Sequence, residues 1–165
     1  MKTRIFTLIM LMFASSLTFG QLKEKDNLLG GTLGLWAYNE VPAFGFNYEN
    51  QITQAGIGSF GLGAIMRFSN YTPNDRGKIS NLFIGGQGNY NFNQIGSGKF
   101  VPFVGLVVGF YSSTPDGNDA KESGLWTWGQ AGSRYFFTPN IAGVARFGLG
   151  NFHFNTLEVG MDFKF

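Results

Sequence analysis

The feature that most constrains the fold is an alternation of apolar with polar or small residues, which returns eight times along the chain. It is clearest in residues 157–165, where every second residue is apolar: Leu157, Val159, Met161, Phe163 and Phe165. Successive side chains of a β-strand point to opposite faces, so this pattern predicts strands with two unlike faces. After residue 20, no segment keeps the 3.6-residue apolar period of an amphipathic helix. We therefore predict an all-β fold.

The alternating segments are long enough to cross a membrane as tilted strands, which takes about 9–11 residues each. Their approximate ranges are Leu28–Tyr38, Ala43–Asn50, Ile57–Ser69, Ile79–Phe92, Phe100–Tyr111, Leu125–Phe137, Ile141–Gly150 and Leu157–Phe165. An even number of antiparallel strands can close on itself and leave no free edge. The pattern predicts an eight-stranded antiparallel up-and-down transmembrane β-barrel.

The connectors between these segments should alternate between the two ends of the barrel. Three predicted turns share one end with the termini: Gln51–Gly56, Asn93–Lys99 and Thr138–Asn140. The four connectors at the other end are longer on average: Asn39–Pro42, Asn70–Lys78, Ser112–Ser123 and Asn151–Asn155. Membrane barrels have short periplasmic turns and longer outer loops, so we expect both termini in the periplasm.

The first 20 residues have the features of an export signal. Lys2 and Arg4 precede an apolar stretch over residues 5–13, and small residues follow it. This stretch is too short for a membrane-spanning helix, which needs about 20 apolar residues. We predict a signal peptide at 1–20, cleaved before Gln21 or, as the second choice, after Ser16, and a barrel domain at 21–165. The chain has no cysteine, so it has no disulfide and no site for a lipoprotein anchor.

Charge decides whether the apolar faces point inward or outward. A soluble ligand-carrying barrel would expose Lys and Glu on its outer face, yet the eight segments contain a single lysine, Lys164. Charged residues make up 13% of the chain, against about 25% in ordinary soluble domains. The formal charge of +2 comes from Lys2 and Arg4, so no basic surface remains for nucleic acid. We expect the polar faces to be enclosed and the apolar faces to contact lipid.

The carboxyl-terminal segment, an alternating strand that ends on phenylalanine, resembles the terminal strand of bacterial outer-membrane β-barrels. The chain is similar in particular to the small eight-stranded outer-membrane β-barrel domain proteins of Bacteroidetes-type bacteria. This resemblance implies a location in the bacterial outer membrane, contact with lipid and lipopolysaccharide, and a monomer. It also implies that the barrel assembly machinery reads Val159, Met161, Phe163 and Phe165 as the insertion signal.

The charged residues inside the predicted strands are the candidate functional residues. Six of them fall on the inward face: Glu49, Arg67, Arg134, Arg146, Glu158 and Asp162. An unpaired buried charge is costly, so we expect these residues to pair across the lumen. Arg146 should reach Glu158 or Asp162 on the neighbouring strand, and Arg134 should join them. The interior of an eight-stranded barrel is only wide enough for side chains, so such a network would fill it.

Other motifs give weaker signals. Residues 56–61 match the dinucleotide pattern G-x-G-x-x-G but lack the following helix that phosphate binding requires. The acidic segment 116–119 with Glu122 misses the spacing of a calcium loop. His153, the only histidine, has no serine after it in the chain and one nearby carboxylate, Glu158. We predict no catalytic residue, no cofactor and no metal site.

The sequence therefore predicts a non-enzymatic outer-membrane barrel with a structural or surface-interaction role and a lumen filled by side chains. A narrow channel for small or apolar solutes is the alternative. It follows from large inward residues beside inward glycines, which could leave an apolar cavity: Trp36, Phe103, Tyr111, Trp126 and Trp128. An enzyme that modifies lipid A is a third and weaker possibility.

Overall fold

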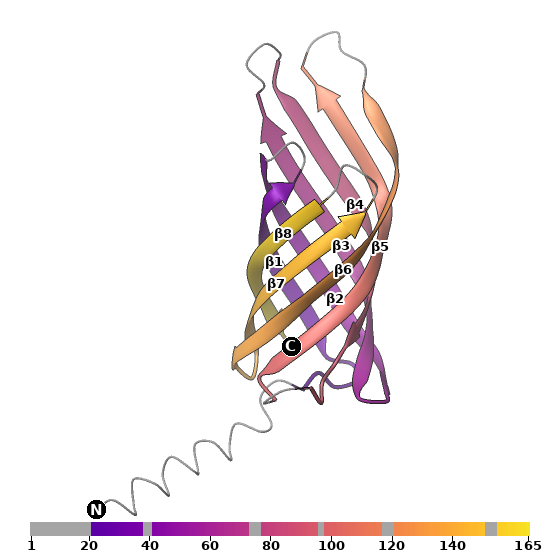
Figure 1. The fold of residues 1–165 in the computed structure, drawn as a ribbon, viewed down its shortest axis with the longest axis vertical. Helices are drawn as coiled ribbons and strands as arrows, with labels where there is room; N and C mark the ends of the chain where they lie inside the picture. Colours follow the sequence, from indigo (N-terminus) through magenta and orange to yellow (C-terminus); the bar gives the residue numbers. More distant parts are fainter. Residues whose placement is uncertain (1–20, 38–40, 73–76, 96–97, 117–120, 151–154) are drawn as a thin grey trace, which may run out of the picture.

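The protein is a closed β-barrel of eight antiparallel strands (Figure 1). The computed structural model describes residues 21–37, 41–72, 77–95, 98–116, 121–150 and 155–165. The strands are β1 (Asn27–Ala37), β2 (Val41–Ala55), β3 (Gly58–Tyr71), β4 (Ile79–Asn91), β5 (Phe100–Pro115), β6 (Glu122–Thr138), β7 (Ile141–Gly150) and β8 (Asn155–Lys164). The predicted fold class is confirmed. None of the described residues belongs to a helix long and apolar enough to span a membrane.

The barrel closes where the first strand meets the last. β1 and β8 pair from Leu28 opposite Lys164 to Gly34 opposite Glu158. Beyond that ladder, Asn27 and Phe165 exchange two backbone hydrogen bonds of 3.0 Å. The seam therefore satisfies the backbone groups that would otherwise form an open edge.

The two faces of the strands are inverted relative to a soluble protein. Large apolar side chains point outward and are exposed, with Leu106 at 73% and Phe165 at 67% of their full accessible area. Many polar side chains of the strands point inward and are buried, among them Arg134, Glu49 and Asn89. Exposed aromatic residues lie near the strand ends, as expected for the interfacial girdles of a membrane barrel: Phe44, Phe68, Tyr135 and Phe165. This surface is suited to contact with hydrocarbon.

The predicted connector at 51–56 is wrong, because β2 continues to Ala55 and the turn occupies residues 56 and 57. A register shift between Gln51 and Thr53 places an extra residue in β2 and interrupts the alternation there. Gly56 makes the turn with a φ of 58°, a conformation that costs glycine little.

The predicted connector at 112–123 is also too long. β5 extends to Pro115 and β6 begins at Glu122, so serine and threonine residues expected in a loop belong to strands. Their two faces are both polar, and alternation therefore could not identify them.

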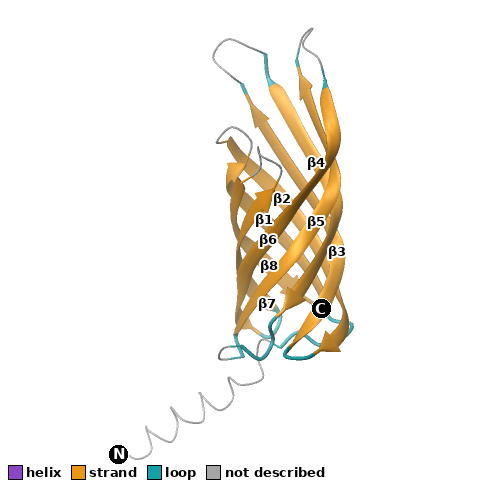
Figure 2. Cartoon of the chain, turned by 45° about the vertical axis from the view of Figure 1, so that its right-hand side comes forward, coloured by secondary structure: helices purple, strands orange, loops and turns teal. Residues whose placement is uncertain are grey.

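The strands differ in length, and the difference shapes one end of the barrel. β1, β7 and β8 have 10 or 11 residues, whereas β2 to β6 have 13 to 17. A tilted crossing takes about 9–11 residues, so the longer strands continue beyond the membrane. Figure 2 shows the β3–β4 and β5–β6 hairpins rising above their neighbours at the end opposite the carboxyl terminus. We call this projection the tall wall.

The interior contains two apolar clusters with polar residues between them. The upper cluster, on the side of the tall wall, consists of Ala43, Ile65, Phe83, Val107, Tyr111 and Trp128, with Trp126 packed against it. The lower cluster, near the end with the carboxyl terminus, consists of Leu22, Leu28, Val101, Phe136 and Ala142. The buried charges occupy the space between the two clusters.

The lumen charge network as a candidate functional site

The six charged residues singled out in the sequence all point into the lumen and are at most 3% exposed. Inward parity on the strands explains their placement, because each occupies a position whose neighbours in the chain face lipid. They come from five strands: Glu49 from β2, Arg67 from β3, Arg134 from β6, Arg146 from β7, and Glu158 and Asp162 from β8. Three arginines face three carboxylates, so the formal charges of this set cancel.

Arg134 joins two carboxylates that come from different strands, Asp162 of β8 and Glu49 of β2. Its Nε donates to Asp162 at 2.6 Å, and its Nη2 donates to Glu49 at 2.7 Å. Its Nη1 donates to the side-chain oxygen of Asn91 at 2.6 Å. The guanidinium also lies 4.5 Å from the centre of the Phe103 ring. This arginine therefore connects strands β2, β4, β5, β6 and β8.

Glu49 is the most completely bonded carboxylate. Besides Arg134, it accepts hydrogen bonds from the side-chain amides of Gln51 at 2.7 Å, Asn89 at 2.7 Å and Asn91 at 2.8 Å. Neither asparagine was predicted to belong to the network, and Gln51 was predicted to lie in a turn. Inward amides close to an inward carboxylate are the signal that could have identified them.

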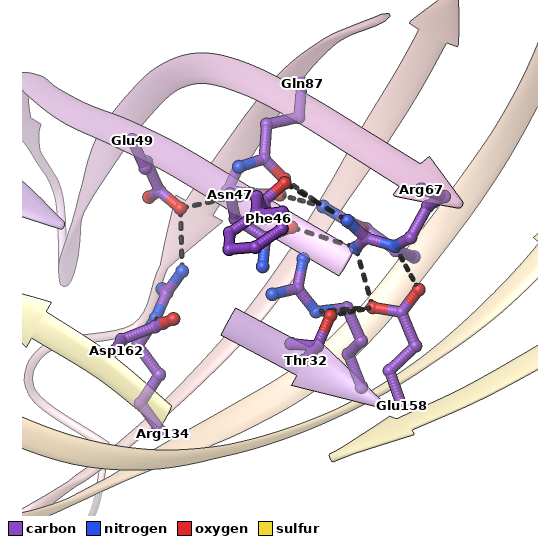
Figure 3. Close-up of polar contacts among 12 residues, drawn as sticks. Thr32, Phe46, Asn47, Glu49, Arg67, Gln87, Arg134, Glu158 and Asp162 are labelled. Carbon is purple, nitrogen blue, oxygen red and sulfur yellow. Dashed lines mark hydrogen bonds and ion pairs between the residues drawn. The ribbon is translucent and has the colours of Figure 1, made fainter. Parts of the chain in front are cut away.

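Arg67 and Glu158 form the second ion pair. The two side chains make a bidentate contact, from Nε at 2.5 Å and from Nη2 at 2.7 Å (Figure 3). Nη2 also donates to the side-chain oxygen of Asn47 at 2.8 Å, and the Thr32 hydroxyl donates to Glu158 at 3.4 Å. Paired N–H groups of this kind give strong, directional bonds.

Arg146 is held differently from the other two arginines. Its Nε lies 3.3 Å from a Glu158 oxygen, a position that forms an ion pair. Its guanidinium makes no hydrogen bond to any group in the described part of the chain. Arg67 already occupies both oxygens of Glu158, so the contact with Arg146 is mainly electrostatic. Arg146 is therefore the most weakly fixed arginine in the lumen.

Inward glycines provide the space that the long side chains fill. A Cβ atom on Gly61 would lie 2.2 Å from a Glu49 carboxylate oxygen, and one on Gly45 would lie 2.7 Å from the Arg67 guanidinium. A Cβ on Gly30 would lie 1.9 Å from an Asp162 oxygen. Atoms cannot approach so closely, so the packing around these charges leaves no room for even a methyl group.

The remaining sequence candidates lie elsewhere. The residues of the predicted insertion signal are exposed on the outer face of β8 and at the carboxyl terminus: Val159, Met161, Phe163 and Phe165. Residues 56–61 form the β2–β3 turn and the first residues of β3. Phe103 contacts the charge network, while Tyr111, Trp126 and Trp128 belong to the upper cluster. His153, residues 117–119 and the side chain of Trp36 lie outside the described residues.

Sequence comparison finds no matching family model and no matching curated protein. Comparison with solved structures finds the same fold in bacterial outer-membrane proteins. OprG of Pseudomonas aeruginosa matches over 90% of this chain and 99% of its own, with 11% identity and a TM-score of 0.61. The N-terminal β-barrel domain of OprF from the same organism matches over 87% and 100%, with 14% identity and a TM-score of 0.59. Ail, the attachment invasion locus protein of Yersinia pestis, matches over 87% and 100%, with 10% identity and a TM-score of 0.55. The chain therefore has the fold of the bacterial outer-membrane β-barrels.

Proposed function

We propose that the protein is a non-enzymatic outer-membrane β-barrel whose lumen is closed by its own side chains and whose role is structural or in surface interaction. The observation that carries this proposal is the ion-pair network enclosed between two apolar clusters. A hydrated ion on its way through the barrel would have to displace Phe83 and Trp128, which pack with ring centres 4.6 Å apart. It would then have to separate Arg134 from both of its carboxylates.

The tall wall supports the surface-interaction part of the proposal. Strands that continue past the membrane place backbone and side chains where a partner outside the cell can reach them. One matched protein is an attachment invasion locus protein, and this name fits a similar role for the present chain. We further propose a monomer that contacts lipid and lipopolysaccharide, is inserted by the barrel assembly machinery, and comes from a Bacteroidetes-type bacterium.

Single-channel recording in planar bilayers tests the closed lumen. Purified protein should give no conductance steps above the bare bilayer, while a porin reconstituted in parallel gives them. Reproducible steps from the folded protein would contradict the proposal and favour the narrow channel.

Mass spectrometry of lipid A tests the enzymatic alternative. Lipid A from cells with and without the protein should give identical mass spectra, and a modified species would favour the enzyme.

Thiol labelling tests the orientation that a surface role requires. The chain has no cysteine, so one introduced residue reports alone. Lys121→Cys, beside the tall wall, should react with an impermeant maleimide on intact cells. Pro139→Cys, in the short turn between β6 and β7, should react only after the outer membrane is permeabilised. The opposite labelling pattern would show that the barrel has the inverse orientation in the membrane.

A further inference from the structure

The segment before the first strand, residues 21–26, lies at the lower end of the barrel and contacts its interior. Leu22 is 1% exposed, although it lies five residues before β1. Its side chain belongs to the lower cluster, together with one residue each from β1, β5, β6 and β7: Leu28, Val101, Phe136 and Ala142. The leucine therefore sits inside the barrel mouth and not along its rim.

Two side-chain amides hold the backbone of Leu22. Its carbonyl oxygen accepts from Gln54 Nε2 at 2.8 Å and from Asn93 Nδ2 at 2.9 Å. Its N–H donates to Asn93 Oδ1 at 3.4 Å, so this one amide contacts both polar groups of the residue. Asn93 is itself fixed by a 3.0 Å hydrogen bond to Ser59 Oγ. The mouth thus combines an apolar recess with donors and an acceptor that match a peptide backbone.

A tight turn connects this residue to the barrel wall. Lys23 N–H donates to the Asp26 carboxylate at 2.8 Å, and Lys25 adopts a φ of 72°. Lys25 N–H then donates to the Gln51 carbonyl at 2.8 Å, and Gln51 N–H donates to the Asp26 carbonyl at 2.9 Å. The segment is therefore hydrogen-bonded to β2 before β1 begins.

We propose that residues 21–26 form a cap, in which Leu22 occupies a binding pocket for an aliphatic residue and its peptide group, and that this cap seals the lower lumen from solvent. The occupant of this pocket, Leu22, belongs to the chain itself, and both predicted cleavage positions leave it in the mature protein. The same end carries the carboxyl-terminal strand, where Lys164 forms a 3.5 Å ion pair with Asp26. The cap therefore also braces the seam between β1 and β8. The cap would have these two roles whether the upper lumen is closed or conducting.

The test measures how fast a cysteine beneath the cap reacts with a small water-soluble thiol reagent. Val101→Cys places the probe in the lower cluster, and Val107→Cys places a matched probe in the upper cluster; both valines are buried. Each is combined with native Leu22, Leu22→Gly or Leu22→Met. Folded protein is first separated by its heat-modifiable mobility, so that unfolded chains do not contribute.

With native Leu22, both probes should react slowly. Leu22→Gly should speed the reaction at Val101→Cys by about tenfold or more, because loss of a buried leucine side chain favours the undocked cap. It should leave Val107→Cys unchanged, and Leu22→Met should preserve protection at both probes. Asn93→Ala, which removes the bonds to the Leu22 backbone, should give an intermediate rate at Val101→Cys. Equal rates at Val101→Cys with and without Leu22, or a parallel rise at both probes, would overturn the proposal.

Discussion

Replacing Arg134 by methionine should lower the free energy of unfolding of the barrel. Most of this loss of stability should arise at one of the two carboxylates that Arg134 contacts. Asp162 has no hydrogen-bond donor other than Arg134 in the described part of the chain, and one of its oxygens has none at all. Glu49 keeps three amide donors after the substitution: Gln51, Asn89 and Asn91. Loss of the arginine therefore leaves the Asp162 carboxylate buried without a hydrogen-bond donor, whereas Glu49 keeps its amide donors.

The expected magnitude follows from this difference. Breaking a buried ion pair by removing one partner costs about 3–5 kcal/mol, mostly because the other charge is left uncompensated. In the Arg134→Met background, Asp162→Asn removes that charge and should recover about 2 kcal/mol or more. Glu49→Gln should recover less, because it turns an amide N–H toward groups that are already donors.

The assay is a pair of double-mutant cycles on reversible unfolding in lipid vesicles. Coupling energies between contacting residues span about 0.5–3 kcal/mol. Arg134 with Asp162 should fall in the upper half of that range, and Arg134 with Glu49 in the lower half. The unfolding slope m should stay constant, so that the differences report stability. If Glu49→Gln recovered as much as Asp162→Asn, the reasoning from unequal bonding would be refuted.

Three further predictions address assembly, depth and packing. Deleting Phe165 or changing it to Asp should sharply reduce the heat-modifiable form in the outer membrane, because its ring is exposed and its backbone bonds to Asn27 at the seam; wild-type amounts would argue against this. Leu106→Arg should cost about 2–4 kcal/mol of unfolding free energy, since it faces hydrocarbon between the aromatic girdles, whereas inward Gln87→Arg should not show this depth-dependent cost. Gly45→Ala should cost about 1–3 kcal/mol, because the new Cβ meets Thr32 and Arg67. Gly31→Ala, whose Cβ would meet nothing closer than 4.0 Å, should be nearly neutral, and equal costs would contradict the filled lumen.

The faces of the strands could be predicted from sequence because side-chain direction depends only on parity along one strand. This is why Arg67, Arg134 and Arg146 were placed inside without knowledge of their partners. Strand boundaries could not be predicted from this parity where the alternation was interrupted or absent. The extra residue in β2 broke the alternation near Gln51, and the polar ends of β5 and β6 carried no alternation to detect.

The Arg146–Glu158 pair on neighbouring strands was predicted and is present. The partners between strands that are not neighbours could not be predicted, because they depend on how eight strands are staggered around the barrel. Arg67 on β3 reaches Glu158 on β8, and Arg134 on β6 reaches Glu49 on β2, across strands that are not neighbours. The cap was missed for a related reason. Leu22 is an isolated apolar residue among polar ones, and only the closed barrel provides the recess that buries it.

Once the register is known, the sequence does explain why the lumen is filled. Many of the large inward side chains lie beside an inward glycine in the hydrogen-bonded ladder: Arg67 opposite Gly45, Asp162 opposite Gly30, Arg146 opposite Gly132, Glu158 opposite Gly34, and Trp128 opposite Gly150. Each glycine gives its neighbour room to lean across the sheet toward a partner, so that large and small residues alternate around the circumference as well as along each strand. Inward glycines that look like space for a solute in one strand are therefore occupied from the next strand. The same glycine content that raised the possibility of a channel is, in the assembled barrel, the condition for closing it.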